Sequence, residues 1–545
     1  MTDRPAARVS AAAAAASALA LALYARVAFP WLVLGWVALV PWLAALDRTR
    51  SLGQALLAGL FMSAAFALAV FSWFPSAIRD YTGAPWALAV VILLLVAPIL
   101  EPQFVVFALA RGLARRSGGS RWRIALAGAF VYVGAEWLSP KLFADTLGHG
   151  LYASSWMRQG ADVAGAHGLT FLLLLGNESV LATTYAALAD APLRTRLRSA
   201  CPPAASVAML VLALLAYGAW RERQLVLDGR HTDAVTVGVV QADIDHYDRL
   251  RATLGTFEAV RTILDAHFAL SLEALGHGDV DFLVWPETVY PTTFGSPKSE
   301  DGAAFDRQIG TFVARAGVPL VFGAYDADGR DEFNAAVFLA PAEHGPLAFE
   351  TYRKAWLFPL SERVPAALDS APVRRWLPWL GTWKPGPGPK VVPLSLRDGR
   401  TLEIAPLICY DAVVPAFALA AVRGGADLIV TLSNDSWFTY GDVPRLILIV
   451  SAFRSIETRR PQVRATNTGI SAVITPSGAL VATAPVHGRA AMVARVEAAP
   501  RATTLMLVWG DWFGPVALVS GVVLVAARRP RRRVRPPASV QSSSR

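Results

Sequence analysis

Long apolar runs separated by short polar segments fill the first 220 residues of the chain, and one further apolar run lies near the C-terminus. The hydrocarbon core of a bilayer needs about 20 mostly apolar residues per helix, and a helix satisfies its own backbone polar groups in lipid. We therefore predict seven membrane-spanning helices before residue 221 and an eighth after residue 503. The predicted spans cover residues 11–23, 29–46, 52–73, 86–110, 122–137, 169–189, 204–220 and 505–527.

The segment 221–503 has a different pattern, in which short β-branched apolar runs alternate with amphipathic stretches. Helices are predicted at 254–275, 305–316 and 447–458, and strands at 235–241, 282–285, 319–323, 334–339, 402–408, 427–432, 471–475 and 491–496. Strands mixed with helices predict a layered α/β domain, with its chemistry at the carboxyl ends of strands. The predicted domains are thus transmembrane (1–220), α/β catalytic (221–503), a final transmembrane helix (504–527) and a basic, disordered cytoplasmic tail (528–545).

The composition agrees with a membrane protein. Hydrophobic residues make up 54% of the chain and charged residues 17%, with a mean hydropathy of +0.42. Soluble globular proteins carry about 25% charged residues. The chain is therefore too apolar to be soluble throughout.

The basic residues give the orientation of the chain. Arginines cluster on one side of the predicted membrane, in segments 4–8, 48–50, 111–123, 194–198 and 528–535. The short loops of the other side hold few basic residues, namely Arg26, Arg79, Lys141 and Arg158. The positive-inside rule makes the arginine-rich side cytoplasmic and places 221–503 on the opposite face. The net charge of +10 therefore reflects topology, and we expect no nucleic-acid binding.

Four carboxylates fall within or near the ends of predicted spans, and such charges often have a function. They are Glu101, Glu136, Glu178 and Asp511. The simpler interpretation is a hydrogen bond between packed helices or at the interface.

The chain has two cysteines, which exclude a disulfide scaffold and a zinc site. Its eight histidines include no ligand-spaced pair, so no metal is expected. Cys201 lies beside an apolar run, and Cys409 is therefore the one thiol of the α/β segment. It ends a predicted strand, where it is either a buried small hydrophobe or a nucleophile.

A thiol needs a base or a positive charge beside it to act as a nucleophile at neutral pH. Glu287, which also follows a predicted strand, can take its proton, and Lys354 can lower its pKa and stabilise an oxyanion. From the residues alone, an ordinary surface salt bridge between Glu287 and Lys354 stays open. A distant histidine partner such as His246 or His277 stays open as well.

The sequence around these residues resembles the nitrilase superfamily and, more narrowly, the apolipoprotein N-acyltransferase family of integral membrane enzymes. The resemblance lies in WPET at 285–288, K-x-x-L-x-P-x-x-E-x-x-P at 354–365 and LICYD at 407–411. Further matches are SNDSWF at 433–438, RSIE at 454–457, RATNTGIS at 464–471 and GDW at 510–512. The resemblance implies a multi-pass helical membrane domain with an αββα nitrilase-like sandwich outside the cytoplasm.

The same resemblance implies a catalytic triad of Cys409 as nucleophile, Glu287 as general base and Lys354 as oxyanion stabiliser. Glu362 would orient the lysine or the substrate, and Tyr410, Asp411 and Asn434 would support the substrate pocket. The implied donor is a phospholipid, and the acceptor is the diacylglyceryl-cysteine of an apolipoprotein. The resemblance further implies a bacterial inner-membrane enzyme, and we expect a monomer without a cofactor.

The chain also departs from the family pattern. Asp411 stands where the family has Glu, Arg249-Leu250 replaces a Lys-Trp pair, Leu446-Ile447 replaces a His-containing segment, and Ala452 replaces an Arg. These changes leave open that the protein is an acyltransferase paralogue that uses a different amine acceptor. The sequence also leaves open a membrane-tethered nitrilase-type amidase and a non-catalytic membrane scaffold.

The loop 363–390 mixes aromatic and basic residues, which favours a membrane interface. We predict a lid in which Trp376 and Trp379 enter the headgroup region, as substrate-binding residues. A loop buried against the helices would have the same composition.

Overall fold

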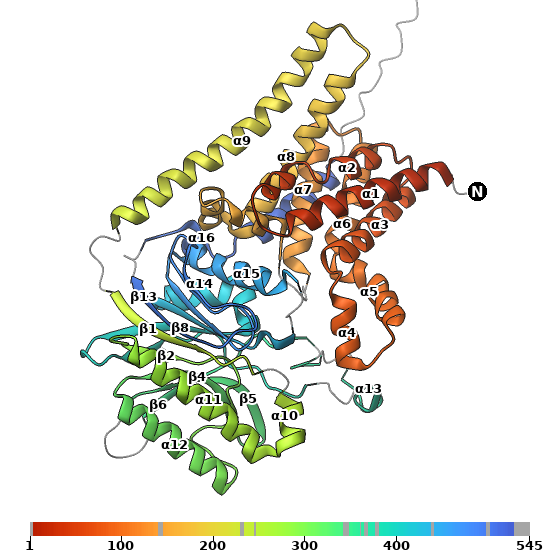
Figure 1. The fold of residues 1–545 in the computed structure, drawn as a ribbon. Helices are drawn as coiled ribbons and strands as arrows, with labels where there is room; N and C mark the ends of the chain where they lie inside the picture. Colours follow the sequence, from red (N-terminus) through yellow and green to blue (C-terminus); the bar gives the residue numbers. More distant parts are fainter. Residues whose placement is uncertain are drawn as a thin grey trace, which may run out of the picture.

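The computed structural model describes residues 4–139, 145–228, 234–244, 247–341, 348–359, 361–364, 369–376, 381–437, 441–497 and 502–527. Its N-terminal part is helical (Figure 1). The α-helices there are α1 (Arg4–Tyr24), α2 (Val40–Asp47), α3 (Leu52–Val70), α4 (Phe74–Thr82), α5 (Trp86–Leu100), α6 (Pro102–Arg116), α7 (Arg121–Leu138), α8 (Ala161–Leu188) and α9 (Leu193–Asp228). Short 3-10 turns η1 (Trp31–Trp36), η2 (Leu147–Ala153) and η3 (Met157–Gly160) connect them.

Several of these helices are suited to a membrane. Among the described residues, three are long and apolar enough to cross a bilayer, namely Leu52–Val70, Met157–Leu188 and Leu193–Leu227. A fourth arises if α5 and α6, which meet at a bend of 51°, form one span. Shorter apolar helices cover Val9–Tyr24, Trp31–Asp47 and Phe513–Ala526. The chain is thus a membrane protein with several apolar helices, whereas the count of eight spans and the domain boundaries stay predictions.

Two predicted continuous spans are broken. The stretch 86–110 divides at Glu101 (φ −124°, ψ 56°), because Pro102 removes a backbone N–H and disfavours helical geometry in the preceding residue. The last span divides into α16 (Leu505–Trp509) and α17 (Phe513–Ala526) at Gly510, whose φ of 80° suits glycine. The first break leaves the Glu101 side chain buried among the helices.

The α/β part contains two sheets. The seven-stranded sheet has the order β13-β1-β2-β4-β5-β6, with β3 paired to β4. Its strands are β1 (Ala234–Gln241), β2 (Phe282–Val284), β3 (Tyr290–Thr293), β4 (Leu320–Asp328), β5 (Asp331–Leu339), β6 (Phe349–Arg353) and β13 (Ala490–Glu497). The six-stranded sheet has the order β12-β11-β10-β9-β8-β7. Its strands are β7 (Val392–Ser395), β8 (Thr401–Ile408), β9 (Leu428–Ser433), β10 (Gln462–Thr466), β11 (Ala472–Ile474) and β12 (Leu480–Thr483).

The two sheets pack face to face and helices cover their outer faces. A core that draws on both sheets lies between them, with Val237, Phe338, Ile404 and Val430 among its members. Helices α11 (Thr256–Gly276) and α12 (Glu300–Ala316) cover the seven-stranded sheet, and α10 (Tyr247–Leu254) lies beside α11. Helices α14 (Pro415–Arg423) and α15 (Val443–Thr458) lie over the other sheet. The predicted αββα nitrilase-like domain is confirmed.

Helix α15 joins the α/β domain to the membrane helices. Its Leu448, Phe453 and Ile456 are buried in the same core as the helical domain. Just after it, the guanidinium of Arg459 forms a buried ion pair with Asp162 of α8 at 2.7 Å. Figure 1 shows α15 along the edge of the α/β domain that faces the membrane helices. The domain is therefore packed onto these helices as well as covalently linked to them.

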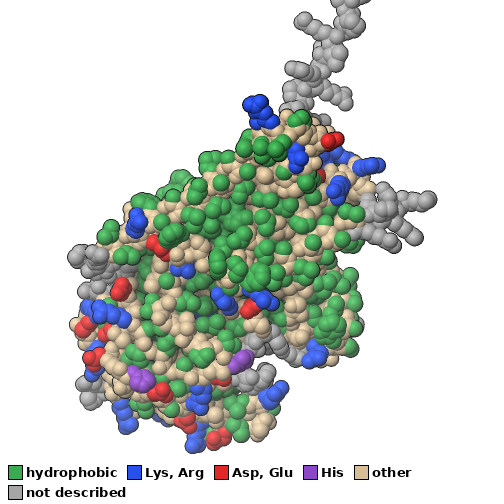
Figure 2. All heavy atoms as spheres, turned by 45° about the horizontal axis from the view of Figure 1, so that its top comes forward, with side chains coloured by type: hydrophobic (Ala, Val, Ile, Leu, Met, Phe, Trp, Pro, Cys, Tyr) green, Lys and Arg blue, Asp and Glu red, His purple; other side chains and the backbone are tan. Residues whose placement is uncertain are grey.

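The surface of the helical part differs in composition from that of the α/β part (Figure 2). Figure 2 shows hydrophobic side chains over much of the helical part, and charged side chains gathered over the α/β part. Exposed apolar side chains on the helices include Leu95, Ile99, Met209, Val519 and Val523. A surface of this kind is stable in contact with lipid, which agrees with the hydropathy of the helices.

Helix α17 packs closely against α7. At Gly134 of α7 the backbones approach so closely that an added Cβ would lie 2.5 Å from the Cα of Leu518. Small residues allow such approaches between membrane helices.

We expect Gly134→Ala to lower the free energy of unfolding by about 1–3 kcal/mol, because the added methyl group overpacks the contact between α7 and α17. Thermal unfolding in detergent, followed by tryptophan fluorescence, measures the change. Gly53→Ala in α3 is the matched control, since the nearest atom to an added Cβ there is Ser51 Oγ at 3.8 Å. Equal midpoints for the two variants would contradict the close contact.

Candidate active site

Four strands end at one edge of the sandwich. Strands β2 and β4 are parallel. Strand β5 is antiparallel to both β4 and β6, so β2, β4 and β6 run in the same direction. In the other sheet β8 and β9 are parallel. Glu287 follows β2, Lys354 follows β6, Cys409 follows β8 and Asn434 follows β9. The topology thus brings these four residues to neighbouring positions.

Cys409 lies in a strained turn. It begins the short 3-10 helix η5 (Cys409–Val413) with φ 48°, a left-handed conformation that costs a non-glycine residue about 1–3 kcal/mol. Its side chain is partly exposed. The same kind of sharp turn at a strand end presents the nucleophile in other hydrolase folds.

Asp411 holds this turn in place. Its Oδ2 accepts hydrogen bonds from Ile408 N at 3.1 Å and from the Tyr352 hydroxyl at 2.9 Å. Its Oδ1 accepts a bond from Trp356 N at 2.7 Å. The side chain is fully buried, so it connects the cysteine turn to the segment that follows Lys354. Tyr410, expected in the pocket, is also largely buried and meets the Phe358 ring edge-on at 5.0 Å.

Lys354 is buried between two carboxylates. Its Nζ lies 3.1 Å from Oε1 of Glu287 and 2.8 Å from Oε1 of Glu362. Lys354 is 1% exposed, so its ammonium depends on these partners for the stabilisation that water would give. Oε2 of Glu362 also accepts the Phe358 N–H at 2.7 Å, which fixes the carboxylate. The surface salt bridge considered from the sequence is therefore wrong.

Asn334 of β5, which the sequence analysis missed, lies between the carboxylates. Its Nδ2 donates to Oε1 of Glu287 at 2.7 Å and to Oε1 of Glu362 at 3.2 Å. Its backbone carbonyl accepts the Lys354 N–H at 2.8 Å. A polar side chain at the start of the apolar run Ala335–Leu339 was the available signal. Asn334 is 5% exposed, and buried polar groups of this kind are hydrogen-bonded.

Asn434 supports Glu287 through its backbone. The Asn434 N–H donates to Oε2 of Glu287 at 2.8 Å, and the Asn434 side chain accepts the Ser436 N–H at 3.4 Å. The next residue, Asp435, forms a buried ion pair with Arg464 at 2.7 Å. These contacts fix the segment after β9, and the sequence analysis did not identify Asp435 or Arg464.

Burial and charge shift the pKa values of the site. Burial raises the pKa of Glu287; the Lys354 ammonium opposes this rise and the Glu362 carboxylate adds to it. Burial alone would lower the pKa of Lys354, but Glu287, Glu362 and Cys409 raise it well above its ordinary value. Loss of hydration raises the pKa of the Cys409 thiol, Glu287 raises it further, and Lys354 opposes both.

The four ionisable groups therefore interact as one site. The pKa values of the Cys409 thiol and the Lys354 ammonium are both raised, and the raised pKa of the Glu287 carboxylate makes it a better base. Among the described residues, no group of three or more His, Cys, Asp or Glu side chains has the arrangement of a metal site. The arrangement is chemically suited to nucleophilic attack by sulfur with proton transfer to a carboxylate.

The predicted lid is described only in part. The Trp376 side chain, at the end of α13 (Ala371–Trp376), and the whole of Trp379 lie outside the described residues. The return segment lies on the site: Trp383 N donates to Glu362 O at 3.1 Å, and Gly386 N to Lys354 O at 2.8 Å. A lid that enters the membrane stays a prediction.

Comparisons with known proteins agree with this architecture. The profile of the apolipoprotein N-acyltransferase N-terminal domain matches residues 15–178, and that of the carbon-nitrogen hydrolase matches residues 236–500. An apolipoprotein N-acyltransferase of Bdellovibrio bacteriovorus is 28% identical over 508 residues, covering 89% of this chain and 88% of the relative. The chain belongs to the apolipoprotein N-acyltransferase family.

The family relationship extends over most of the chain. An apolipoprotein N-acyltransferase of Geobacter metallireducens is 28% identical over 515 residues, covering 92% of this chain and 91% of the relative. Among solved structures, a mutant amidase from Nesterenkonia sp. AN1 aligns with 19% identity and a TM-score of 0.35, covering 51% of this chain and 94% of that chain. Family membership makes the chain a nitrilase-superfamily N-acyltransferase, while the roles of its individual residues stay predictions.

The site predicts opposite changes in thiol reactivity for two variants. Glu287→Gln should speed the alkylation of Cys409 by iodoacetamide several-fold at neutral pH, because the carboxylate that raises the thiol pKa is gone. Lys354→Met should slow it, because the ammonium that lowers the thiol pKa is gone.

Peptide mass spectrometry measures the two rates, with the exposed Cys201 of the same molecule as internal standard. A change of equal sign in both variants would show that the thiol does not sense these charges.

Proposed function

We propose that this protein transfers an acyl chain from a phospholipid to the α-amino group of the N-terminal diacylglyceryl-cysteine of lipoproteins, through a thioester on Cys409. The observation that carries the proposal is the buried Lys354, held at 3.1 and 2.8 Å by two carboxylates beside the partly exposed thiol. The relatives at 28% identity are named apolipoprotein N-acyltransferases, which supports acyl transfer to an apolipoprotein. Arginine-rich loops on one side support a site on the extracytoplasmic face.

In the first half-reaction the sulfur of Cys409 attacks the ester carbonyl of the phospholipid. Glu287 takes the thiol proton during the attack, because the raised thiol pKa leaves little thiolate beforehand. The Lys354 ammonium and the N–H that follows Cys409 stabilise the oxyanion; one such donor typically contributes about 2.7–4 kcal/mol. The lysophospholipid alkoxide leaves with the proton from Glu287, and the acyl chain stays on sulfur.

In the second half-reaction the acceptor amine attacks the thioester carbonyl. Glu287 takes the proton of the amine, the C–S bond breaks, and the thiol of Cys409 recovers its proton as the amide forms. A thioester is less stable than an amide, so the transfer needs no further source of energy. A base that takes and returns one proton in each half-reaction requires a pKa near the working pH, which agrees with the raised pKa of Glu287.

The setting of the site supports a lipid donor. The α/β domain is packed onto the membrane helices through α15, and its last strand leads through α16 into the apolar helix α17. Trp356, two residues from Lys354, is 47% exposed, as expected for an aromatic side chain at a membrane interface. An amidase acting on a soluble substrate would need neither feature.

We expect Cys409→Ser to abolish N-acylation of a lipopeptide in a reconstituted assay while the protein stays in the membrane. Incubation of the wild-type enzyme with phospholipid should increase its intact mass by one acyl chain, and hydroxylamine should remove that chain. Cys201→Ser is the matched control and should retain both results, since Cys201 lies in α9. Acylation by the Cys409 variant would refute the mechanism, and acyl release to water alone would favour the amidase.

Two further variants should move the acidic limb of the pH–rate profile in opposite directions. The Asn334 hydrogen bond lowers the pKa of Glu287 and the Glu362 carboxylate raises it. Asn334→Leu should therefore raise that pKa, so that activity is lost at a higher pH as the solution is acidified. Glu362→Gln should lower it and extend activity to lower pH.

The measurement is kcat/KM against pH at saturating acceptor, with Glu273→Gln on the exposed face of α11 as control. If the acidic and basic limbs of the pH–rate profile shifted together in all three variants, Glu287 could not be the base whose protonation abolishes activity at low pH.

A further inference from the structure

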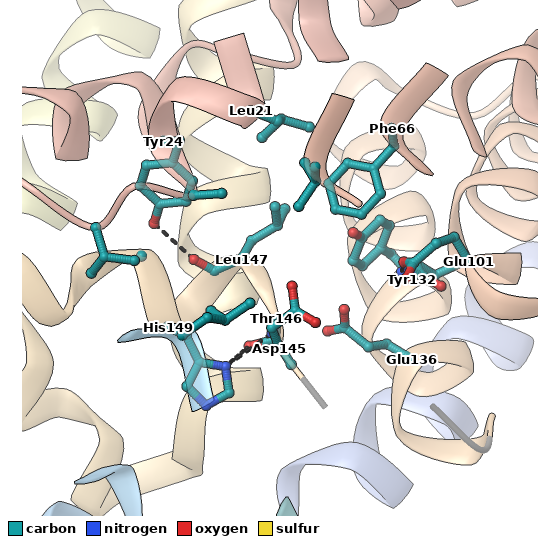
Figure 3. A pocket seen from close by; sticks show the side chains of 16 residues that line it. Leu21, Tyr24, Phe66, Glu101, Tyr132, Glu136, Asp145, Thr146, Leu147 and His149 are labelled. Carbon is teal, nitrogen blue, oxygen red and sulfur yellow. Dashed lines mark hydrogen bonds between the residues drawn. The ribbon is translucent and has the colours of Figure 1, made fainter. Parts of the chain in front are cut away.

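Two hollows of the described structure differ in the size of ligand that they admit. The first, shown in Figure 3, lies among the membrane helices, is lined by Tyr24 and Tyr132 among others, and has a volume of about 30 Å³. That space matches one or two water molecules and is too small for an organic ligand. The second has a volume of about 810 Å³ and lies on the outer side of the α/β domain, between α11 and α12. We call it the α11–α12 groove.

The α11–α12 groove has an apolar floor. The rings of Phe268 in α11 and Phe312 in α12 lie 4.8 Å apart, and both lie against the buried Trp285. Leu272, one turn after Phe268, also lines the groove and is 61% exposed. Figure 1 shows α12 at the end of the α/β domain that is farthest from the membrane helices, so lipid does not cover these side chains. A contiguous apolar surface that faces water commonly marks a contact with another molecule.

Three arginines surround this floor. Arg307 and Arg315 lie on α12, and Arg397 comes from the turn between β7 and β8. All three are exposed, and within the described part of the chain none of them forms an ion pair or a side-chain hydrogen bond. Asp279 is the one acidic residue among the described lining residues, so the groove has two positive charges in excess, three minus one.

The spacing of the charges indicates the shape of the ligand. Arg307 and Arg315 are eight residues apart, and eight residues of α-helix span about 12 Å. Acidic side chains seven or eight positions apart on a facing helix have a similar separation and lie on one side of that helix. A small anionic amphiphile carries its charge at one point and would meet only one of the two guanidinium groups. The groove therefore matches an acidic, amphipathic α-helix.

Other parts of the system match the groove less well. The chain's own segment 528–545 is rich in arginine, so its charge has the same sign as that of the groove. The acyl-transfer site is remote, because Arg397 precedes and Cys409 follows β8, whose eight residues span about 26 Å. A substrate held at Cys409 thus does not account for the groove.

We propose that the α11–α12 groove binds an acidic, amphipathic helix of a partner protein, on the same side of the membrane as the α/β domain. The apolar side of that helix packs on Phe268, Leu272 and Phe312, and two of its carboxylates pair with Arg307 and Arg315. Amphipathic helices bind apolar grooves of other proteins in this manner. This binding does not depend on the proposed acyl transfer.

Cross-linking in living cells tests the nature of the occupant. A photoreactive amino acid in place of Leu272 in the full-length protein should form a cross-link to another protein, and peptide mass spectrometry identifies the attached segment. We expect apolar residues at helical spacing in that segment, with two acidic residues seven or eight positions apart. Arg307→Glu together with Arg315→Glu should abolish the cross-link. Arg261→Glu, on the exposed face of α11 outside the groove, should preserve it.

The captured segment, synthesised as a peptide, gives a second readout with purified full-length protein in nanodiscs. Reversing the charge of Arg307 and Arg315 should weaken its binding about tenfold or more, because two attractions become repulsions, and added salt should weaken binding to the wild-type protein. A peptide with lysine in place of its two acidic residues should bind the double variant more tightly than the wild type. The double variant should keep the wild-type unfolding midpoint, since both side chains are exposed.

Recovery of affinity by the charge-swapped peptide supports the proposal. A cross-link only to a second copy of this chain or only to lipid would overturn it, and so would the absence of any cross-link. A captured segment without the acidic pair, or equal affinity of the peptide for the wild type and the double variant, would overturn it as well.

Discussion

The buried ammonium of Lys354 and its two carboxylate partners are the constraint on which the active site depends. Removing a lysine charge from water costs several kcal/mol, roughly, and only close and well-oriented partners repay that cost. The partners come from separate segments, Glu287 after β2 and Glu362 after β6, with Asn334 of β5 between them. Strands β2, β5 and β6 must therefore keep their register to within the length of a hydrogen bond, and any slip would leave a buried charge unpaired.

The proposed nucleophile, Cys409, follows a strand of the other sheet, β8. Cys409 interacts electrostatically with the lysine because the two sheets share one apolar core and pack face to face. Asp411 strengthens that contact, since it accepts the hydroxyl of Tyr352 from β6 and the N–H of Ile408 from β8. Burial raises the pKa of Asp411 to about 6, while the Lys354 charge and the hydrogen bonds from Trp356 N, Ile408 N and Tyr352 oppose this rise. The side chain of Asp411 thus stabilises the turn that carries Cys409.

Helix α15 joins the α/β domain to the membrane helices. One face belongs to the core of the helical domain, through Leu448 and Phe453, and Arg454 reaches the cysteine turn. The buried Arg459–Asp162 pair follows directly after the helix. The cysteine turn is thus attached to the core of the helical domain through one helix.

The sequence by itself determined the apolar helices and most strands of the α/β domain, and it indicated Cys409, Glu287 and Lys354 as candidate site residues, because hydropathy, strand periodicity and short motifs are local properties. It missed β6, whose residues FETYR are as polar as a loop, and the short strands β3, β7, β10 and β12. Only the tertiary structure decided that Asn334 bridges two carboxylates, that Asp411 joins the sheets and that Glu101, Glu136 and Asp145 face one cavity. Such contacts join residues that are tens of positions apart, and their geometry depends on strand register and helix packing, which no local sequence pattern contains.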